Sequence, residues 1–586
     1  MGYPLRSCSG LSPLLVATLL FVGACDRVEE ITHADPTEAA DAFISSWNAQ
    51  DVVAMAEALD GSSGTKWPAP RLRRLLEVVQ RSGAIEDMTI ERTGALEEPP
   101  EAAFEEQGEA PEAKVPYTIA YRSESMRRRI EFEGELSLLY SSSRDAWAPV
   151  WERELMWPGE EGAVRFAVDY EWLRRGAILD RDGAKLAVGA PESRRYPAGV
   201  VGGTTVGHIE PISKKDLKDH GRAMQVGDLV GASGLEQGLD EVLAGKPLVT
   251  LSLVDRKSRL IEVLARAAGA KGRNVRTTLD IEVQRAAESA YGSTTGGAVV
   301  MDPKTGDLLA VVSSSPFDPG NYAGVGGIEP FNRALSGLYP PGSSLKAMTG
   351  AAALESKVVR ESTPLTGPQE YMGVRNFESG DFGSIDFATA VRFSVNTAFA
   401  QVAEDLGARR LTRFADAFGF NSEPSMPLRA AIPSFPFPQD LGDLMWGSIG
   451  QAQVLATPLQ MATIAATIAN DGWRMEPRVV LRGRREVRRV VSRRTAAVMT
   501  RLMETVVQGG TGTAAHIAGA RVAGKTGTAE VDVNGKRMNH AWFICFAPAN
   551  DPKVAVAVVS ELGGVGGEVA APLARGILTA VLPLVR

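Results

Sequence analysis

A helix followed by a strand hairpin opens the last and largest part of this chain. Residues 281–291 carry apolar side chains at helical spacing, which predicts an amphipathic helix. Two apolar runs, residues 297–301 and 308–312, then predict strands, because the turn residues of 302–306 (Asp, Pro and Gly among them) separate them. We expect this unit to begin an α+β domain over residues 271–586.

The remaining sequence is long enough for further domains. With 586 residues and about 150 residues per domain, the chain has room for roughly three to four of them. Helical spacing followed by alternating strands predicts a small α+β domain at residues 36–158. Residues 174–183 predict a short strand that enters an Asp/Gly turn, and this turn marks a separate module at residues 159–270.

The amino terminus has the features of an export signal. The apolar run at residues 11–24 would span about 21 Å as a helix, which is shorter than the roughly 30 Å hydrocarbon core of a bilayer. It ends in small residues before Cys25 and resembles a bacterial lipobox, so we predict a signal segment at residues 1–25, lipid attachment at Cys25 and a linker at residues 26–35. An uncleaved signal anchor and simple secretion are the alternatives. Each of the three places the rest of the chain outside the cytoplasmic membrane.

Composition excludes several classes of function. The 63 basic and 71 acidic residues give a net charge of −8, so nucleic acid is not expected as a partner. Three cysteines, two of them in the first 25 residues, cannot form a disulfide framework. Five scattered histidines do not suggest a metal centre, and we expect neither a metal nor a cofactor.

The first candidate catalytic motif is the S-x-x-K pattern of Ser343 and Lys346. The Pro-Pro-Gly sequence just before it predicts a helix start, with the helix running to about Glu355. Residues three apart share a helix face, so the Lys346 amine could take the proton of the Ser343 hydroxyl. The backbone N–H groups of a helix N-terminus could also stabilise an oxyanion.

Two further short motifs follow in order. Ser394 and Asn396 form Ser-x-Asn just before a predicted helix, and Lys525 begins Lys-Thr-Gly-Thr in an extended stretch that two apolar strands follow. A second cation such as Lys525 would lower the pKa of Lys346 and make it a better base. Each motif also occurs once earlier in the chain, so context rather than spacing separates the two sets. The earlier copies are Ser63/Lys66, Ser46/Asn48 and Lys304–Gly306.

With these three motifs in this order, the chain resembles the monofunctional, class B penicillin-binding proteins, the D,D-transpeptidases of peptidoglycan synthesis. Other segments are similar to the family's pedestal, also called the dimerisation domain, and to its transpeptidase flanks. They are residues 175–183 and 231–236 for the pedestal, and 278–280, 450–451, 457–462 and 510–514 for the transpeptidase domain. One departure is Ala452, because the family usually has Gly-Gln-Gly at residues 450–452, and we expect this change to have little effect.

The resemblance implies a multidomain α+β fold. Its C-terminal domain would be the penicillin-binding/β-lactamase-like transpeptidase fold, an antiparallel five-stranded sheet flanked by helices. A β-rich pedestal would precede it. Residues 36–158 resemble the nuclear-transport-factor-like extension of the subgroup that includes the methicillin-resistance protein of staphylococci.

The resemblance also implies roles for the motif residues. Ser343 would be the nucleophile, Lys346 the general base and Ser394 a proton relay. Asn396 would hold the substrate amide by hydrogen bonds. The carboxylate-binding residues would be Lys525, Thr526, Gly527 and Thr528.

The expected partners are peptidoglycan stem peptides and β-lactams, with a glycosyltransferase or a division or elongation scaffold as a protein partner. The same serine could instead serve a D,D-carboxypeptidase or a β-lactamase-like hydrolase. A non-catalytic sensor of β-lactams or muropeptides is a third alternative. His516 and His540 lie near the Lys525 motif, but no G-x-S-x-G accompanies them, so we interpret them as structural residues.

Overall fold

The computed structural model describes residues 33–59, 66–104, 110–219, 221, 223–314, 316–325, 331–483 and 486–585. The predicted signal segment and Cys25 lie outside these residues. The chain divides into two compact units, the first reaching to Val168 and including Thr250–Arg266, the second formed by Asp169–Val249 and Ala267–Arg586. Among the residues that the structure describes, no helix is both long and apolar enough to cross a membrane.

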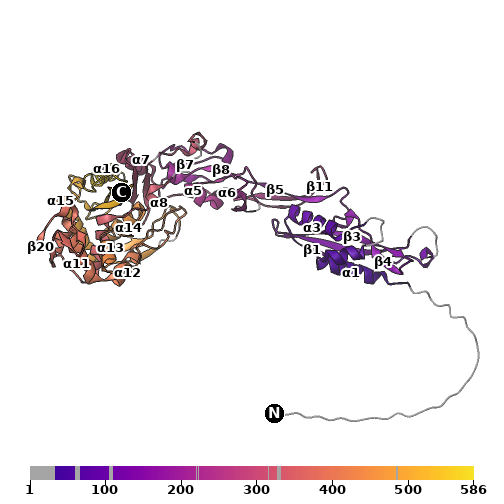
Figure 1. The fold of residues 1–586 in the computed structure, drawn as a ribbon. Coiled ribbons are helices and arrows are strands. Elements are labelled where there is room, and N and C mark those ends of the chain that lie inside the picture. The colour runs from indigo at the N-terminus through magenta and orange to yellow at the C-terminus, as the bar shows by residue number, and fades with distance from the viewer. Residues whose placement is uncertain are drawn as a thin grey trace, which may run out of the picture. The chain divides into compact units, whose positions relative to one another are not determined.

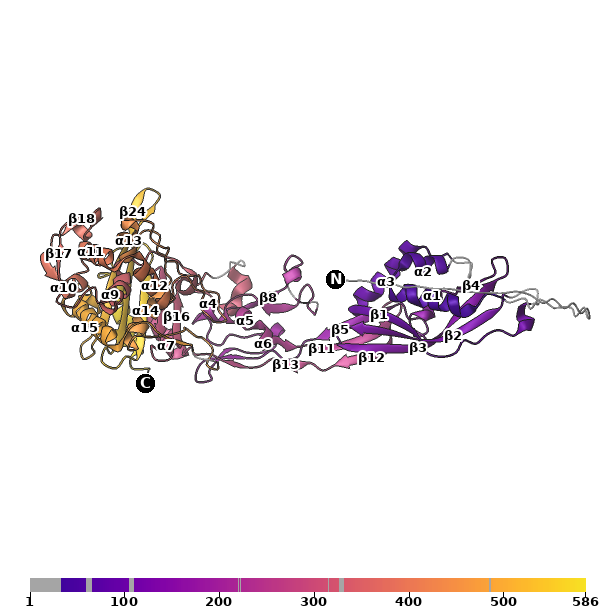
Figure 2. The same ribbon diagram turned by 90° about the horizontal axis from the view of Figure 1, so that it is seen from below.

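The first unit packs three helices against an antiparallel sheet of order β1-β2-β3-β4 (Figures 1 and 2). The helical spacing at the start of this domain corresponds to two helices. The second one begins after Asp51, which caps it by accepting hydrogen bonds from the N–H groups of Val53 and Ala54. The tryptophans Trp147, Trp151 and Trp157 are only 7%, 5% and 1% exposed and belong to the core. The elements are α1 (Pro36–Asn48), α2 (Val52–Ala58), α3 (Ala69–Gly83), β1 (Ile85–Arg92), β2 (Glu112–Ser123), β3 (Arg128–Ser141) and β4 (Ala146–Pro149).

Three long strands form a separate sheet of order β12-β11-β5. They are β5 (Arg165–Glu171), β11 (Leu248–Val254) and β12 (Leu260–Ala267). Residues 250–266, which the sequence analysis places in the second domain, thus belong to the first compact unit.

The first part of the second unit consists of short elements held by turns and buried charges. The predicted strand and Asp/Gly turn are present, since the Asp180 carboxylate accepts hydrogen bonds from the N–H groups of Asp182, Gly183 and Ala184 after the strand β6. The elements are β6 (Ile178–Leu179), β7 (Lys185–Ala187), α4 (Gly203–Val206), β8 (Ile209–Pro211), β9 (Leu229–Gly231), α5 (Gly234–Gly238), α6 (Asp240–Ala244), β10 (Gly245–Lys246), β13 (Ala270–Lys271) and β14 (Val275–Arg276).

A buried ion cluster ties these short elements together. The Glu236 carboxylate, fully buried, accepts hydrogen bonds from Arg175 Nη2 at 2.8 Å and from Arg194 Nε at 2.7 Å. Asp240 accepts from the remaining Nη1 of Arg175 at 2.7 Å. Because two guanidinium groups share one carboxylate away from water, each charge depends on the others for compensation.

We expect Glu236→Gln to destabilise the protein by about 3 kcal/mol, because it leaves two buried guanidinium groups without their shared counter-charge. Denaturant unfolding measures this loss. Glu282→Gln is the matched control, because Glu282 pairs with Arg285 on an exposed helix face where an ion pair contributes at most about 1 kcal/mol. Equal effects of the two substitutions would contradict the assignment.

The second part of this unit is built on the five-stranded sheet of order β16-β15-β25-β24-β23, in which all neighbouring strands are antiparallel. This confirms the predicted antiparallel sheet. The strands are β15 (Gly296–Met301), β16 (Leu308–Ser313), β23 (Ala523–Val533), β24 (Lys536–Ala547) and β25 (Val554–Ser560). The helices are α7 (Ile281–Tyr291), α8 (Arg333–Ser336), α9 (Lys346–Glu355), α10 (Phe387–Arg392), α11 (Asn396–Leu406), α12 (Ala408–Phe418), α13 (Leu441–Ser448), α14 (Pro458–Ala469), α15 (Arg493–Gly509) and α16 (Ala570–Val581). The minor strands are β17 (Pro364–Gly367), β18 (Glu370–Tyr371), β19 (Val374–Arg375), β20 (Gly383–Asp386), β21 (Trp473–Met475) and β22 (Val487–Arg489).

Both faces of this sheet are buried at the strands β15, β16 and β25, so these three strands are apolar along nearly their whole length. On β15, Ala298 and Val300 join the core under α7 and α16, whereas Val299 and Met301 join the core that contains α9 and α14. Alternate side chains of a strand point to opposite faces, which explains the two cores. The strand β23 forms one edge of the sheet, and this edge carries the third motif.

Candidate functional site

Ser343 lies in a tight turn that leads into helix α9. The turn is a 3-10 helix over Gly342–Leu345, and the α-helix begins only at Lys346, one turn later than predicted. Gly342 explains the turn, because its φ is +53° and a Cβ there would stand 2.7 Å from the carbonyl oxygen of Thr528. Ser343 is partly exposed, while Lys346 is 1% exposed.

The Lys346 amine lies at the centre of the hydrogen bonds in the site. It donates to the carbonyl oxygen of Ser394 at 2.8 Å, to Ser394 Oγ at 3.3 Å and to Asn396 Oδ1 at 2.5 Å. Ser343 Oγ donates to the same Asn396 Oδ1 at 3.5 Å. Ser343 and Lys346 therefore share an acceptor.

Ser394 connects the first motif with the third. It lies between α10 and α11 with a φ of +59°, an uncommon conformation for a residue other than glycine. Its Oγ accepts a hydrogen bond from Lys525 Nζ at 2.8 Å as well as the one from Lys346. One hydroxyl thus contacts both lysine amines.

Burial changes the protonation of both lysines. Removal from water lowers the pKa of Lys525 to about 7. Burial also lowers the pKa of Lys346 well below its ordinary value, and the positive charge of Lys525 lowers it further. The lowered pKa favours the unprotonated amine of Lys346, which is the form that accepts a proton.

The third motif lies on edge strand β23, directly against the Ser343 turn. A Cβ on Gly527 would stand 2.7 Å from the carbonyl oxygen of Pro341, so a side chain at this position would push the strand away from the turn. The Thr526 hydroxyl lies 2.6 Å from that of Thr511, and Thr528 Oγ1 accepts from the N–H of Gly566. The structure thus brings together all eight predicted residues of the three motifs, which are Ser343, Lys346, Ser394, Asn396, Lys525, Thr526, Gly527 and Thr528.

The earlier motif copies have other contacts where the structure describes them. In α1, Ser46 bonds the carbonyl oxygen of Phe43, and Asn48 bonds that of Ile90. Lys304 pairs with Asp551 at the hairpin turn. These contacts explain the earlier residues by local structure.

Two features of the site were missing from the sequence interpretation. Asn396 was predicted to bind substrate alone, yet its Oδ1 also bonds Ser343 and Lys346. Thr511 was noted only as part of a segment that is similar to the family's transpeptidase domain. In the structure its hydroxyl contacts that of Thr526, which lies 15 residues later on strand β23. The Gly-Thr-Gly-Thr pattern around Thr511 was the available signal.

The departure at Ala452 is placed in a left-handed turn. Its φ is +57°, a conformation that glycine takes without steric cost, and its side chain is exposed. The neighbouring Gly450 cannot be replaced as easily, because a Cβ there would stand 2.2 Å from the carbonyl oxygen of Gly342.

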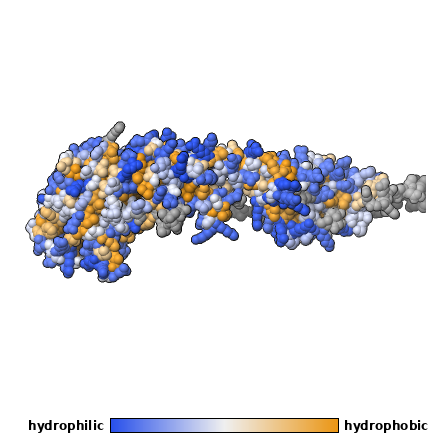
Figure 3. Space-filling view, turned by 90° about the horizontal axis from the view of Figure 1, so that it is seen from above, coloured by the Kyte–Doolittle hydropathy of each residue, from blue (hydrophilic) through white to orange (hydrophobic). Residues whose placement is uncertain are grey.

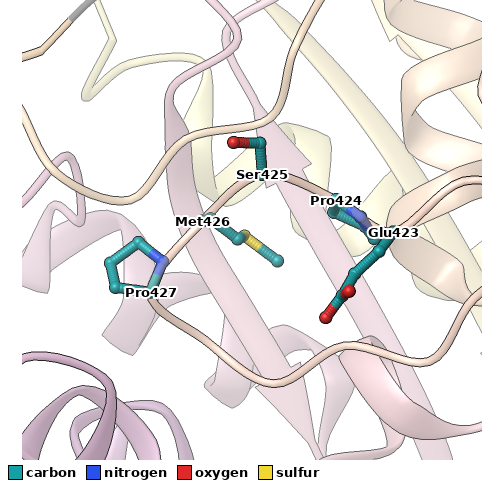
Figure 4. Close-up of a pocket in the computed structure, with 5 residues that line it drawn as sticks. All are labelled: Glu423, Pro424, Ser425, Met426 and Pro427. Atoms are coloured by element: carbon teal, nitrogen blue, oxygen red, sulfur yellow. The ribbon is translucent and has the colours of Figure 1, made fainter. Parts of the chain in front are cut away.

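A hollow of about 560 Å³ lies elsewhere in the second unit. A single loop supplies its lining, and Figure 4 shows the side chains of Glu423, Pro424, Ser425, Met426 and Pro427. Glu423 is the one ionisable group in this lining, so the hollow offers little for catalysis. The face drawn in Figure 3 mixes apolar and hydrophilic residues and does not by itself mark a site.

Comparison with known proteins gives a consistent result. The model of the penicillin-binding protein transpeptidase domain matches residues 296–579, and that of the penicillin-binding protein dimerisation domain matches residues 186–277. The peptidoglycan D,D-transpeptidase PbpA of Mycolicibacterium smegmatis is 36% identical over 402 residues, which cover 60% of this chain and 80% of that protein.

Solved structures agree with this match. The crystal structure of PBPA from Mycobacterium tuberculosis has 32% sequence identity and a TM-score of 0.58, covering 70% of this chain and 98% of that one. Pseudomonas aeruginosa PBP2, in complex with WCK 5153, has 28% identity and a TM-score of 0.61, covering 71% and 96%. With its motifs in one site on the edge of an antiparallel sheet, this chain belongs to the penicillin-binding protein transpeptidase family.

Proposed function

We propose that the protein is a serine D,D-transpeptidase that cross-links peptidoglycan stem peptides. The observation that carries the proposal is the contact of two buried lysine amines with one serine hydroxyl, beside a second serine that shares an acceptor with Lys346. This arrangement supplies a nucleophile, a base and a fixed cation within one hydrogen-bonded group. The names of the relatives, peptidoglycan D,D-transpeptidases, support the same activity.

In the first half-reaction, Ser343 Oγ attacks the carbonyl carbon of the penultimate D-Ala of a stem peptide that ends in D-Ala-D-Ala. The hydroxyl proton passes to Lys346 Nζ. For this transfer the Ser343 side chain must rotate from Asn396 Oδ1 toward the Lys346 amine. The C–N bond then breaks, the terminal D-Ala leaves as an amine that receives a proton through Ser394, and an ester forms on Ser343. Ser394 suits this relay because its hydroxyl already contacts both lysines.

Lys525, Thr526 and Thr528 would bind the terminal carboxylate of the substrate. A protonated Lys525 supplies the charge, and hydroxyl groups supply directed donors. The backbone N–H groups of Ser343 and Thr528 would form the oxyanion hole, where one donor typically contributes about 3 kcal/mol. Because β23 is an edge strand, the stem peptide can add to the sheet beside it.

In the second half-reaction, an amine from a neighbouring stem attacks the ester, forms the cross-linking amide and returns the proton to Ser343. A β-lactam would acylate the same serine. Since its ring-opened product has no departing fragment, that adduct would persist.

An assay of D-Ala release tests the proposal and separates it from the alternatives. The purified full chain is mixed with a pentapeptide mimic ending in D-Ala-D-Ala, with and without an acceptor amine. We expect acceptor-dependent formation of a new amide. Release of D-Ala with hydrolysis alone would indicate a D,D-carboxypeptidase. If no D-Ala is released, the protein would instead be a non-catalytic binding protein.

For the rest of the chain, we propose the division given by the sequence, with a nuclear-transport-factor-like domain at residues 36–158, a pedestal at 159–270 and a transpeptidase domain at 271–586. Residues 159–168 and 250–266 of this pedestal pack within the first compact unit. The helices packed on a four-stranded antiparallel sheet support the first assignment. We also propose lipid attachment at Cys25, which would hold the catalytic domain on the outer face of the cytoplasmic membrane. A glycosyltransferase or a scaffold protein of division or elongation would be its partner there.

A further inference from the structure

The loop that follows helix α15 contacts the substrate-facing strand through one hydroxyl pair. Thr511 Oγ1 lies 2.6 Å from Thr526 Oγ1, a short distance for two hydroxyl groups. Thr526 is 5% exposed, next to the buried Lys525, whereas Thr511 is exposed. The hydroxyl pair therefore links the loop to the strand that carries Lys525.

The backbone fixes the position of Thr511 from two sides. On one side, the Thr511 N–H donates to the carbonyl oxygen of Arg392, and Arg392 Nε donates to that of Gly509. On the other side, Gly567 lies so close that a Cβ on it would stand 2.5 Å from the Thr511 carbonyl oxygen. Arg392 precedes Ser394 by two residues, so this loop joins the second motif to the third.

The hydroxyl pair has a direct consequence for donor direction. Each hydroxyl carries one proton. When two hydroxyls bond each other, one of them donates its proton, and the one that accepts can donate its own proton to a third group. If Thr511 donates to Thr526, the Thr526 proton is free to point to an anion beside Lys525. Without the Thr511 hydroxyl, the Thr526 hydroxyl can rotate, and its proton no longer points preferentially to the anion.

We propose that Thr511 is a positioning residue that orients the Thr526 hydroxyl as a donor to the ligand's carboxylate. This inference rests on the proposed function, because it assigns a role within the carboxylate site of that reaction. Thr511 acts through Thr526 and selects for ligands with a free carboxylate. It contributes nothing to ligands in which that group is masked.

The test compares acylation of the full chain by benzylpenicillin and by its methyl ester, which differ in the carboxylate alone. For Thr511→Val we expect the second-order rate constant with benzylpenicillin to fall about tenfold, since a hydrogen bond to a charged group contributes at least that much. The rate with the ester stays at the wild-type value. Thr511→Ser restores the preference for the acid, because it returns the hydroxyl.

Thr513→Val is the matched control, since Thr513 is exposed on the same loop two residues later and should keep wild-type rates with both compounds. An equal slowing of acid and ester in Thr511→Val would overturn the inference and assign Thr511 a structural role. An unchanged acid rate would also overturn it. If neither compound acylates the wild type, the proposed function itself fails, which distinguishes the two failures.

Discussion

Ser343→Ala is expected to abolish covalent labelling by benzylpenicillin. In the wild type, intact-mass measurement should show a persistent increase equal to one molecule of the drug. The alanine variant lacks the oxygen that forms the ester, and the neighbouring Ser394 hydroxyl already accepts hydrogen bonds from both lysines. The expected result is therefore no adduct.

Ser63→Ala provides the control for this experiment, because Ser63 belongs to the other S-x-x-K sequence of the chain. It should keep full labelling. An adduct that survives in Ser343→Ala, or one that disappears in Ser63→Ala, would contradict the assignment of the nucleophile.

Lys346→Met should slow acylation by about a thousandfold, the contribution expected of a positioned general base. Methionine has a similar length and suits a buried position, so the fold should be kept, but it cannot accept a proton. The measurement is the second-order acylation rate from stopped time courses, together with thermal unfolding to verify the fold.

The pH dependence gives a second readout for the same residue. The neutral amine is the base, so the wild-type rate should fall as the pH drops through the lowered pKa of Lys346. This loss at low pH should be absent in Lys346→Met. Lys304→Met, in the earlier Lys-Thr-Gly copy with its exposed ion pair to Asp551, should behave as the wild type. A rate in Lys346→Met within a few-fold of the wild type would exclude Lys346 as the base.

The sequence predicts the main elements of the catalytic unit because their signals are local. The apolar runs around Val299, Val311 and Val556 are short and bounded by turn residues, which indicates buried strands, and all three residues are buried. The order of the three motifs likewise indicates which serine and lysines belong together. In the structure Asp35 and Asp280 lie directly before α1 and α7, and each side chain caps its helix by accepting hydrogen bonds from N–H groups of the first turn.

Other features depend on contacts that no local pattern records. Ser394 and Lys525 lie 131 residues apart, so the meeting of both lysines at one hydroxyl follows from tertiary packing. The 3-10 turn at Ser343 replaces the expected first helical turn, because Gly342 adopts a positive φ against Thr528. The partner of a strand is also not given by its own sequence, and in the structure β11 pairs with both β12 and β5.

The position of the acyl group on the chain tests the assignment of the nucleophile most directly. The protein is mixed with a stem-peptide donor ending in D-Ala-D-Ala without an acceptor, quenched in acid and digested, and the modified peptide is fragmented by tandem mass spectrometry. We expect the acyl group on Ser343, with the adjacent Ser344 unmodified because its hydroxyl is buried and donates to the carbonyl oxygen of Pro341. An acyl group on Ser344, on Ser394 or on any other residue would contradict this assignment.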